Sequence, residues 1–175
     1  SSAFHDACAP WQYALTARAG TECVAHVVTA LTQLDPNATV LSIDGISAFD
    51  SISRKAMLTN LARTPEACAA LPFVRLFYGT PSTYLWYDDE GNAHEVSQAE
   101  GGEQGDPLMP ALYALGQHSA LEAVATHLRP DETLLSFLDD TYVVSKGDRT
   151  RTLFDLVGQE LWNHCRVKVN LGKTK

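Results

Sequence analysis

The feature that most constrains the fold is a pair of adjacent carboxylates between two apolar segments. Asp139 and Asp140 follow the run Leu134–Leu138 and precede Thr141–Val144. The flanking residues favour β-strands, so the pattern predicts a β-hairpin with both acids at its tip. Neighbouring carboxylates repel each other unless a cation lies between them, and oxygen ligands suit a hard divalent cation such as Mg²⁺. A solvated polar turn is the alternative interpretation, because Asp is common in turns.

A third carboxylate ends a separate strand-like run. The segment 38–44 is rich in strand-forming residues and finishes with Asp44, followed by Gly45. Side chains alternate along a strand, so Leu41 and Ile43 are predicted to face the core while Asp44 lies on the other face. The carboxyl end of a strand is where open α/β sheets usually bind ligands. A terminal Asp that binds nothing is the alternative.

Two further segments have the composition of binding loops. Residues 101–105 form a glycine-rich loop that runs through Asp106 and Pro107 into a long apolar segment. Glycine lets a ligand approach the backbone closely, and the free N–H groups of a helix start suit phosphates. The segment 167–175 is typical of a strand, a turn and a basic end, or else of a solvated charged tail.

Length and composition allow one compact core and oppose simple nucleic-acid binding. The chain has 175 residues, 45% of them hydrophobic, and a formal net charge of −8. A nucleic-acid binder usually carries a basic patch, so this charge is an objection to that class. No apolar run is long enough to span a membrane. The four cysteines are widely spaced and lack zinc-site spacing, which indicates free thiols, with Cys23 and Cys68 expected to be buried.

The periodicity predicts a mixed fold. Helices are expected near 22–34, from Ser53 onward, from Pro65 to near Gly79, and near 107–128 and 148–163. Strands are expected near 38–44, 82–87, 93–97, on both sides of the Asp pair, and near 165–170. Helices and strands mixed around one antiparallel sheet indicate the α+β class.

Four motifs, in this order, resemble those of reverse transcriptases, and they are most similar to the non-LTR (LINE-like) retrotransposon type. The motifs are an Asp-x-x-x-Ala-Phe-Asp run, a Gln-Gly-x-Pro-Leu run, an aromatic-x-Asp-Asp run and an Asn-x-x-Lys-Thr run. They lie at residues 44–50, 104–108, 137–140 and 170–174. Met109 stands where that family usually has Ser, and Phe137-Leu138 stands where Tyr-Ala is commoner. The resemblance covers nearly the whole chain.

The resemblance implies a polymerase palm, in which a ferredoxin-like antiparallel sheet is backed by helices, with a partial fingers segment. Residues 1–175 are then expected to form a single reverse transcriptase domain fragment that lacks the thumb and much of the fingers. Those missing parts supply much of the basic surface in polymerases. The implied activity is RNA-directed DNA synthesis, with an RNA template, a DNA primer, dNTPs and the remainder of a larger retroelement polypeptide as partners. An intracellular location is expected, nuclear in a eukaryotic host, with no membrane partner.

The resemblance also implies a metal site for two-metal phosphoryl transfer. Asp44, Asp139 and Asp140, with the carbonyl of Gly45, are expected to bind two Mg²⁺ ions, for which Mn²⁺ can substitute. One ion would activate the primer 3′-hydroxyl and the other would bind the triphosphate. Lys173 is expected to approach the triphosphate and to protonate the pyrophosphate.

The same resemblance assigns the nucleotide pocket. Phe49 matches the steric-gate position, where a bulky ring meets a ribose 2′-hydroxyl and favours deoxynucleotides. The alternative is an ordinary core Phe. Gln104 and Gly105 are expected to line the nucleotide and template pocket through side-chain and backbone contacts.

Three other functions are alternatives to this one. A non-catalytic, palm-like remnant of a mobile element would act only as a binding or structural domain, but all three aspartates are intact. A nucleotide cyclase is suggested by Gly101-Gly102-Glu103, but a Gln-Gly-Asp-Pro run and a helix follow it instead of the required hairpin. An RNA-templated RNA polymerase is disfavoured, because Leu138 replaces its usual Gly and Phe49 favours deoxynucleotides.

Overall fold

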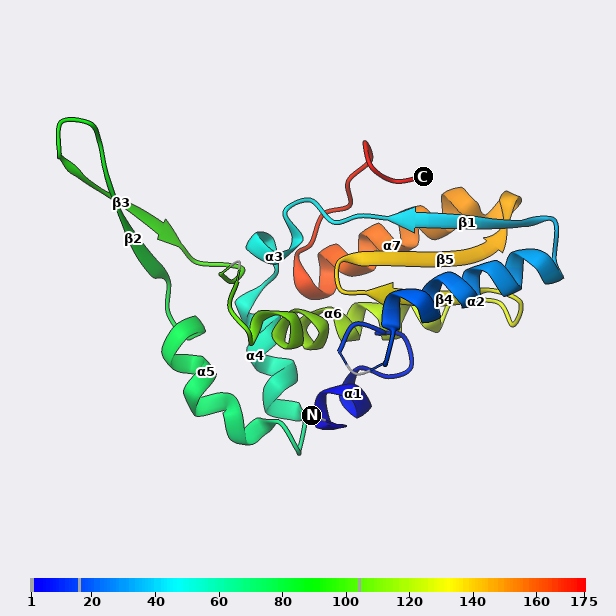
Figure 1. The fold of residues 1–175 in the computed structure, drawn as a ribbon, viewed down its shortest axis with the longest axis horizontal. Helices are drawn as coiled ribbons and strands as arrows, with labels where there is room; N and C mark the ends of the chain where they lie inside the picture. Colours follow the sequence, from blue (N-terminus) through cyan, green and yellow to red (C-terminus); the bar gives the residue numbers. More distant parts are fainter. Residues whose placement is uncertain (1, 16, 104) are drawn as a thin grey trace.

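A three-stranded antiparallel sheet forms the centre of the molecule (Figure 1). The computed structural model describes residues 2–15, 17–103 and 105–175. The strands are β1 (Ala38–Ile43), β4 (Thr133–Phe137) and β5 (Asp140–Lys146), and β5 lies in the middle. The predicted strand at 38–44 and the predicted hairpin around the Asp pair are therefore confirmed.

The two ends of the chain flank this sheet. Gln12 forms an isolated parallel bridge with Ser136 at the outer edge of β4. On the other side, Gly45 forms an isolated antiparallel bridge with Val169. The strand predicted near 165–170 is wrong as a regular strand, because α7 (Thr150–Cys165) continues to Cys165 and leaves only this bridge.

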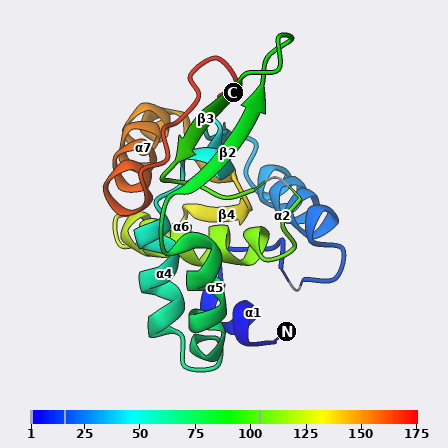
Figure 2. The ribbon, with the colours of Figure 1, turned by 90° about the vertical axis from the view of Figure 1, so that its left-hand side faces the viewer.

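Helices cover the sheet on both sides. Figure 2 shows α6 (Met109–Ala125) and α7 on one side and α2 (Gly20–Leu34) on the other. Alternation along β1 buries Leu41 and Ile43, as predicted, and both pack into the core. The largest fully buried side chains come mostly from α4 (Arg54–Arg63), α6 and α7; among them are Met57, Leu61, Met109, Leu112, Tyr113, Leu115, Leu121 and Leu153.

The middle of the chain forms a second group of elements. Short helix α3 (Ala48–Ser51) is followed by α4 (Arg54–Arg63), whose start is capped by Ser53 Oγ accepting from the Ala56 N–H at 3.4 Å. The helix predicted from Pro65 instead begins with a 3₁₀ turn, Cys68–Ala70, before α5 (Leu71–Tyr78). The hairpin of β2 (Ser82–Tyr87) and β3 (Ala93–Gln98) then projects away from the body, as Figure 1 shows.

Two smaller predictions have mixed outcomes. All four cysteines are free, as predicted, but Cys8 and Cys165 are the buried ones, while Cys23 and Cys68 are only partly buried. A short helix, α1 (Ser2–Cys8), was not predicted. Within the described ranges, no helix is long and apolar enough to cross a membrane.

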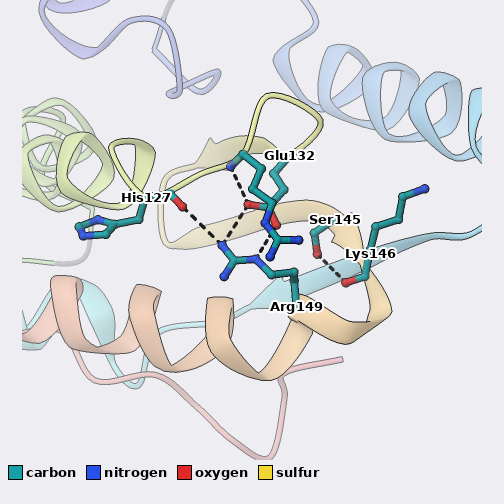
Figure 3. Close-up of polar contacts among 6 residues, drawn as sticks. His127, Glu132, Ser145, Lys146 and Arg149 are labelled. Atoms are coloured by element: carbon teal, nitrogen blue, oxygen red, sulfur yellow. Dashed lines mark hydrogen bonds and ion pairs between the residues drawn. The ribbon is translucent and has the colours of Figure 1, made fainter.

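A cluster of charged residues around Glu132 and Arg149 lies at the end of the sheet opposite the Asp139–Asp140 turn (Figure 3). Arg149, in the 3₁₀ turn Gly147–Arg149 after β5, donates from Nε to Glu132 Oε1 at 2.9 Å. Glu132 Oε2 also accepts from the backbone N–H of Arg129 at 2.9 Å. The Glu132 side chain is only 1% exposed, so these contacts hold the loop before β4 against the end of β5.

Candidate active site

The β4–β5 turn places two carboxylates at one end of the sheet. Leu138 and Asp139 form the turn, and Asp140 begins β5 opposite Phe137. Burial raises the pKa of Asp139, and the negative charge of Asp44 raises it further. Burial also raises the pKa of Asp140, with additional contributions from Asp139 and Asp44. Asp44 therefore lies close enough to both turn carboxylates to disfavour their charged forms.

Strand register explains why Asp44 reaches this turn. The β1–β5 pairing ends with Ile43 opposite Thr141. Continuing an antiparallel register by one residue puts Asp44 opposite Asp140. The sequence-predicted acids, far apart along the chain, are thus brought to the same end of the sheet.

The C-terminal segment packs against Asp44 from the other side. Lys173 Nζ lies 3.6 Å from Asp44 Oδ2, and the Lys173 side chain is 71% exposed. Asn170 donates from Nδ2 to the same Oδ2 at 3.1 Å and from its backbone N–H to the Asp44 carbonyl at 2.8 Å. Asn170 also accepts from the Gly172 N–H through Oδ1 at 3.1 Å, which shapes the turn carrying Lys173.

The donor chemistry of this cluster fits a hard divalent cation. Carboxylate oxygens are the ligands that Mg²⁺ prefers, and the raised pKa values of Asp139 and Asp140, to which the charge of Asp44 contributes, indicate negative charge that a cation would offset. Among residues 2–15, 17–103 and 105–175, no three His, Cys, Asp or Glu side chains form a ready-made metal-binding group. Gly45 follows Asp44 directly, and a Cβ there would lie 2.8 Å from the Ala48 Cβ.

A pocket between α3 and the start of α6 contains two of the predicted nucleotide-binding residues. Phe49 and Gly105 line the same cavity of about 400 Å³, together with Glu103, Asp106, Pro107, Met109 and Pro110. A Cβ added at Gly105 would meet nothing within 4 Å, so its backbone borders open space. Gln104, the third predicted residue, lies outside the described residues.

Tyr113 forms the floor beneath Phe49 and was missed by sequence reasoning. The two rings stack with centroids 4.7 Å apart and planes 17° apart. Tyr113 is fully buried, and its hydroxyl has no hydrogen-bond partner among the residues described. Burial raises the pKa of Tyr113 well above its usual value, with smaller contributions that include the three acids. An aromatic residue on an apolar helix carries no sequence signal that separates this position from ordinary core.

The glycine-rich loop is held against α3 by backbone contacts. The Gly101 N–H donates to the Ile52 carbonyl at 2.7 Å, and the Gly102 N–H donates to the Phe49 carbonyl at 3.0 Å. Gly101 has φ of +66°, and a Cβ there would lie 2.1 Å from the Asp50 carbonyl oxygen. Glycine is therefore required at this position for both conformation and space.

Arg54 is a second residue that sequence reasoning missed. Its guanidinium donates to the carbonyls of Gly101 and Thr80, both at 2.8 Å, and to Ser82 Oγ at 3.1 Å. The residue is only 4% exposed. A lone Arg at a helix start is ordinarily solvated, so its sequence position did not reveal this role. Arg54 joins the glycine-rich loop to the segment that leads into β2.

Asp106 stabilises the turn that leads from the loop into α6. Its Oδ1 accepts from the Leu108 N–H at 2.8 Å, and its Oδ2 accepts a short hydrogen bond from the Tyr78 hydroxyl. Burial raises the pKa of Tyr78 to about 12, and the bond to Asp106 adds to the effect. Both ends of the loop are therefore fixed, one by Arg54 and one by Asp106.

Comparison with known proteins identifies the fold. The family model described as reverse transcriptase (RNA-dependent DNA polymerase) matches residues 3–175. None of the curated proteins matches the chain. An apo telomerase from Candida tropicalis, truncated of its C-terminal domain, aligns with a TM-score of 0.72 and 14% identity, covering 99% of this chain and 38% of that one.

A telomerase from Candida albicans, solved with a TWJ fragment of telomeric RNA, aligns with a TM-score of 0.71 and 11% identity. It covers 100% of this chain and 32% of that one, so this chain spans about a third of the length of these structures. The fold is a mixed α/β arrangement of antiparallel sheets backed by helices, similar to the palm-like fold of these telomerases. Because the family model matches nearly its whole length, the chain belongs to the reverse transcriptase (RNA-dependent DNA polymerase) family.

Proposed function

We propose that this chain is the catalytic core of an RNA-directed DNA polymerase that adds dNTPs to a primer 3′-hydroxyl. The observation that carries the proposal is the placement of Asp44 opposite the Asp139–Asp140 turn by the β1–β5 register. Phosphoryl transfer depends mainly on positioning and charge neutralisation, and a convergent set of carboxylates suits that task. Membership of the reverse transcriptase family supports the same reaction class.

Asp44, Asp139, Asp140 and the carbonyl of Gly45 are the residues that would hold two Mg²⁺ or Mn²⁺ ions. Bound there, such ions would activate the attacking hydroxyl and neutralise the leaving pyrophosphate. Lys173 is close to Asp44 and largely exposed, so its ammonium can swing from that carboxylate toward a bound triphosphate. In that position it would donate a proton to the leaving pyrophosphate.

The pocket shared by Phe49 and Gly105 would accept the incoming nucleotide. The family motif supports a contact from Gln104 to the same nucleotide or to the template. Phe49 is fixed from below by Tyr113, so its ring cannot move away from an added 2′-hydroxyl without disturbing the core. This rigidity supports a steric-gate role that selects deoxynucleotides. The open space at Gly105 supports a close backbone approach to the nucleotide or template.

Within the reverse transcriptase family, we propose that the chain is of the non-LTR retrotransposon type. The four motifs and their order support it, and the partners would be an RNA template, a DNA primer and the rest of a larger retroelement polypeptide. Residues 1–175 would form one reverse transcriptase domain, without the thumb and much of the fingers. The part of each telomerase chain that aligns, 38% and 32%, is consistent with such a division. In a eukaryotic host the protein would act in the nucleus.

Primer extension on an RNA template tests the proposal. In the polypeptide that carries this chain, Asp44→Asn and Asp139→Asn are each expected to lower the extension rate at least about 100-fold, because each removes charge from the reacting centre. Asp155→Asn is the matched control, because its side chain is 54% exposed on α7. Normal extension by Asp44→Asn would refute the assignment.

A magnesium titration separates the polymerase from a non-catalytic remnant. A ligand that binds only the folded state raises the melting temperature, and the increase grows with the ratio of ligand concentration to Kd. We expect Mg²⁺ to raise the melting temperature of the wild type and to have a smaller effect on Asp139→Asn. A remnant that has lost metal binding would show the same small effect in both.

A further inference from the structure

A buried polar network lies directly beneath the Asp139 turn. It joins four side chains from four separate segments: Gln12, Gln117 of α6, Ser136 of β4 and Thr141 of β5. All four are at most 5% exposed. Buried polar groups are costly unless they are hydrogen-bonded, so a network of this size in a small core needs a reason.

Gln12 uses the whole hydrogen-bonding capacity of its amide. Its Oε1 accepts from the Leu138 N–H at 2.8 Å and from the Ala14 N–H at 3.3 Å. Its Nε2 donates to Gln117 Oε1 at 3.4 Å and to Ser136 Oγ at 3.3 Å. A glutamine amide offers two lone pairs and two N–H donors, so no capacity remains. The two backbone donors also fix which end of the amide carries the oxygen.

The hydrogen bond that Gln12 accepts comes from a residue with an unfavourable backbone conformation, Leu138. Leu138 has φ of 53°, in the left-handed region that a branched side chain rarely adopts. Its N–H is bound by Gln12, and its carbonyl accepts from Ser136 Oγ at 3.1 Å. A strained turn residue persists only where its surroundings determine it, and here both of its backbone polar groups are held by the buried network.

Backbone contacts clamp Gln12 itself to the sheet. The Ser136 N–H donates to the Trp11 carbonyl at 2.8 Å, and the Tyr13 N–H donates to the Ser136 carbonyl at 2.8 Å. These bonds flank Gln12 and form the isolated parallel bridge that attaches its segment to the edge of β4. The backbone that carries the Gln12 side chain is therefore held in place by hydrogen bonds to β4.

We propose that Gln12 is a positioning residue, which holds the Leu138–Asp139 turn in the conformation that presents the two carboxylates for catalysis. The proposal rests on the polymerase function proposed above. Gln12 touches neither substrate nor the carboxylates, and it acts through the Leu138 backbone. Its loss would leave a buried N–H without a partner and would let the turn relax, which displaces Asp139 and Asp140 from their place opposite Asp44.

Gln12→Met tests this, because methionine has similar length but cannot accept a hydrogen bond. Gln12→Glu is the rescue variant, because a carboxyl group still accepts from Leu138 and, when protonated by burial, still donates. Leu153→Ala is the control for general destabilisation, since Leu153 is a fully buried α7 residue outside the network. Amide exchange at Leu138, melting temperature and primer-extension kinetics are measured for each.

We expect Gln12→Met to accelerate Leu138 amide exchange at least about 10-fold relative to Val143, because the bond that protects it is gone. The kcat should fall about 10- to 100-fold with the dNTP KM within about two-fold, since small misplacements of reacting groups slow chemistry strongly. Gln12→Glu should keep Leu138 protected, and Leu153→Ala should change neither relative exchange nor kcat.

Leu138 protection in Gln12→Met equal to that of the wild type would assign Gln12 to core stability alone and overturn the proposal. Equal losses of kcat in Gln12→Met and Leu153→Ala, at matched melting temperature, would do the same. Exchange at Leu138 does not depend on catalysis. The measurement therefore still decides the role of Gln12 if the aspartate variants show that the polymerase function itself is wrong.

Discussion

Asn170 holds Asp44 at two points, donating to its Oδ2 from Nδ2 at 3.1 Å and to its carbonyl from the backbone N–H at 2.8 Å. The backbone bond continues the sheet beyond β1, and the side-chain bond orients the carboxylate. Lys173 approaches the same oxygen from a turn that Asn170 also stabilises. Asn170, from the motif at residues 170–174, thus helps to position both Asp44 and Lys173 of the proposed site.

Asn170→Ala is therefore expected to lower polymerase activity more than stability. Loss of two side-chain hydrogen bonds, one partly buried to Asp44 and one exposed from the Gly172 N–H, should lower the free energy of unfolding by about 1 to 2 kcal/mol. The kcat should fall about 10-fold or more, because the carboxylate loses its fixed orientation. Primer extension and urea unfolding measure the two effects. Asn163→Ala, on the exposed surface of α7, is the control, and an equal loss of kcat in both variants would contradict the prediction.

Phe49→Ala tests the steric gate. Removing the ring opens space above Tyr113, where a 2′-hydroxyl would otherwise collide. The ratio of ribonucleotide to deoxynucleotide incorporation should rise at least about 10-fold, which corresponds to the loss of a clash worth about 1.4 kcal/mol. Single-nucleotide incorporation with each substrate measures it. The stacked pair also contributes about 1 kcal/mol to stability, so the ratio and not the absolute rate is decisive. An unchanged ratio would identify Phe49 as a core residue only.

Arg54→Met should destabilise the fold much more than substitution of an exposed arginine does. It removes three hydrogen bonds from a side chain that is 4% exposed and leaves the Gly101 and Thr80 carbonyls without this donor. We expect the free energy of unfolding to fall by roughly 3 kcal/mol. Urea unfolding measures it, with Arg75→Met as control, because exposed Arg75 should change stability by no more than about 0.5 kcal/mol. Similar values for the two would refute the buried role of Arg54.

Gly101→Ala and Gly105→Ala form a matched pair. Both glycines have positive φ, at +66° and +93°, so both substitutions carry a backbone cost of about 1 kcal/mol. Only at Gly101 would the added Cβ collide with backbone, at 2.1 Å from the Asp50 carbonyl oxygen. Gly101→Ala should therefore cost about 2 kcal/mol more than Gly105→Ala by urea unfolding. Equal costs would show that the loop does not pack against α3 as described.

The Glu132–Arg149 pair should make stability pH-dependent. The bond from Arg149 lowers the pKa of Glu132 below its ordinary value of 4.5. A lowered folded-state pKa means that the stabilisation is complete above the unfolded pKa and is lost as the pH falls through the folded pKa. Glu132→Gln should cost about 1 to 2 kcal/mol at pH 7.

The difference between Glu132→Gln and the wild type should stay constant down to about pH 5.5 and shrink below about pH 4.5. Thermal unfolding across this range measures it. A difference that is independent of pH down to pH 3 would show that the contact is not charge-dependent.

Local patterns alone were enough to predict most elements and the acids of the site. Alternation in β1, the apolar runs around Asp139 and Asp140, and the Ser53 cap all encode structure within a few residues, and the structure contains each of them. The hairpin of β2 and β3 was likewise predictable from two runs around a polar turn. The errors lie at boundaries, as where the strand predicted near 165–170 is reduced to an isolated bridge at Val169 after the end of α7, because such edges depend on packing more than on propensity.

Only the tertiary structure decided which residues support the site. No local pattern reveals the roles of Gln12, Arg54 and Tyr113, because their partners Leu138, Gly101 and Phe49 lie far away in the sequence. Their burial and hydrogen bonds exist only once the chain ends flank the sheet and the glycine-rich loop reaches α3. The sequence by itself determined the fold class and the identity of the acids. Long-range packing decided how those acids are held, because that depends on contacts between segments that no local pattern encodes.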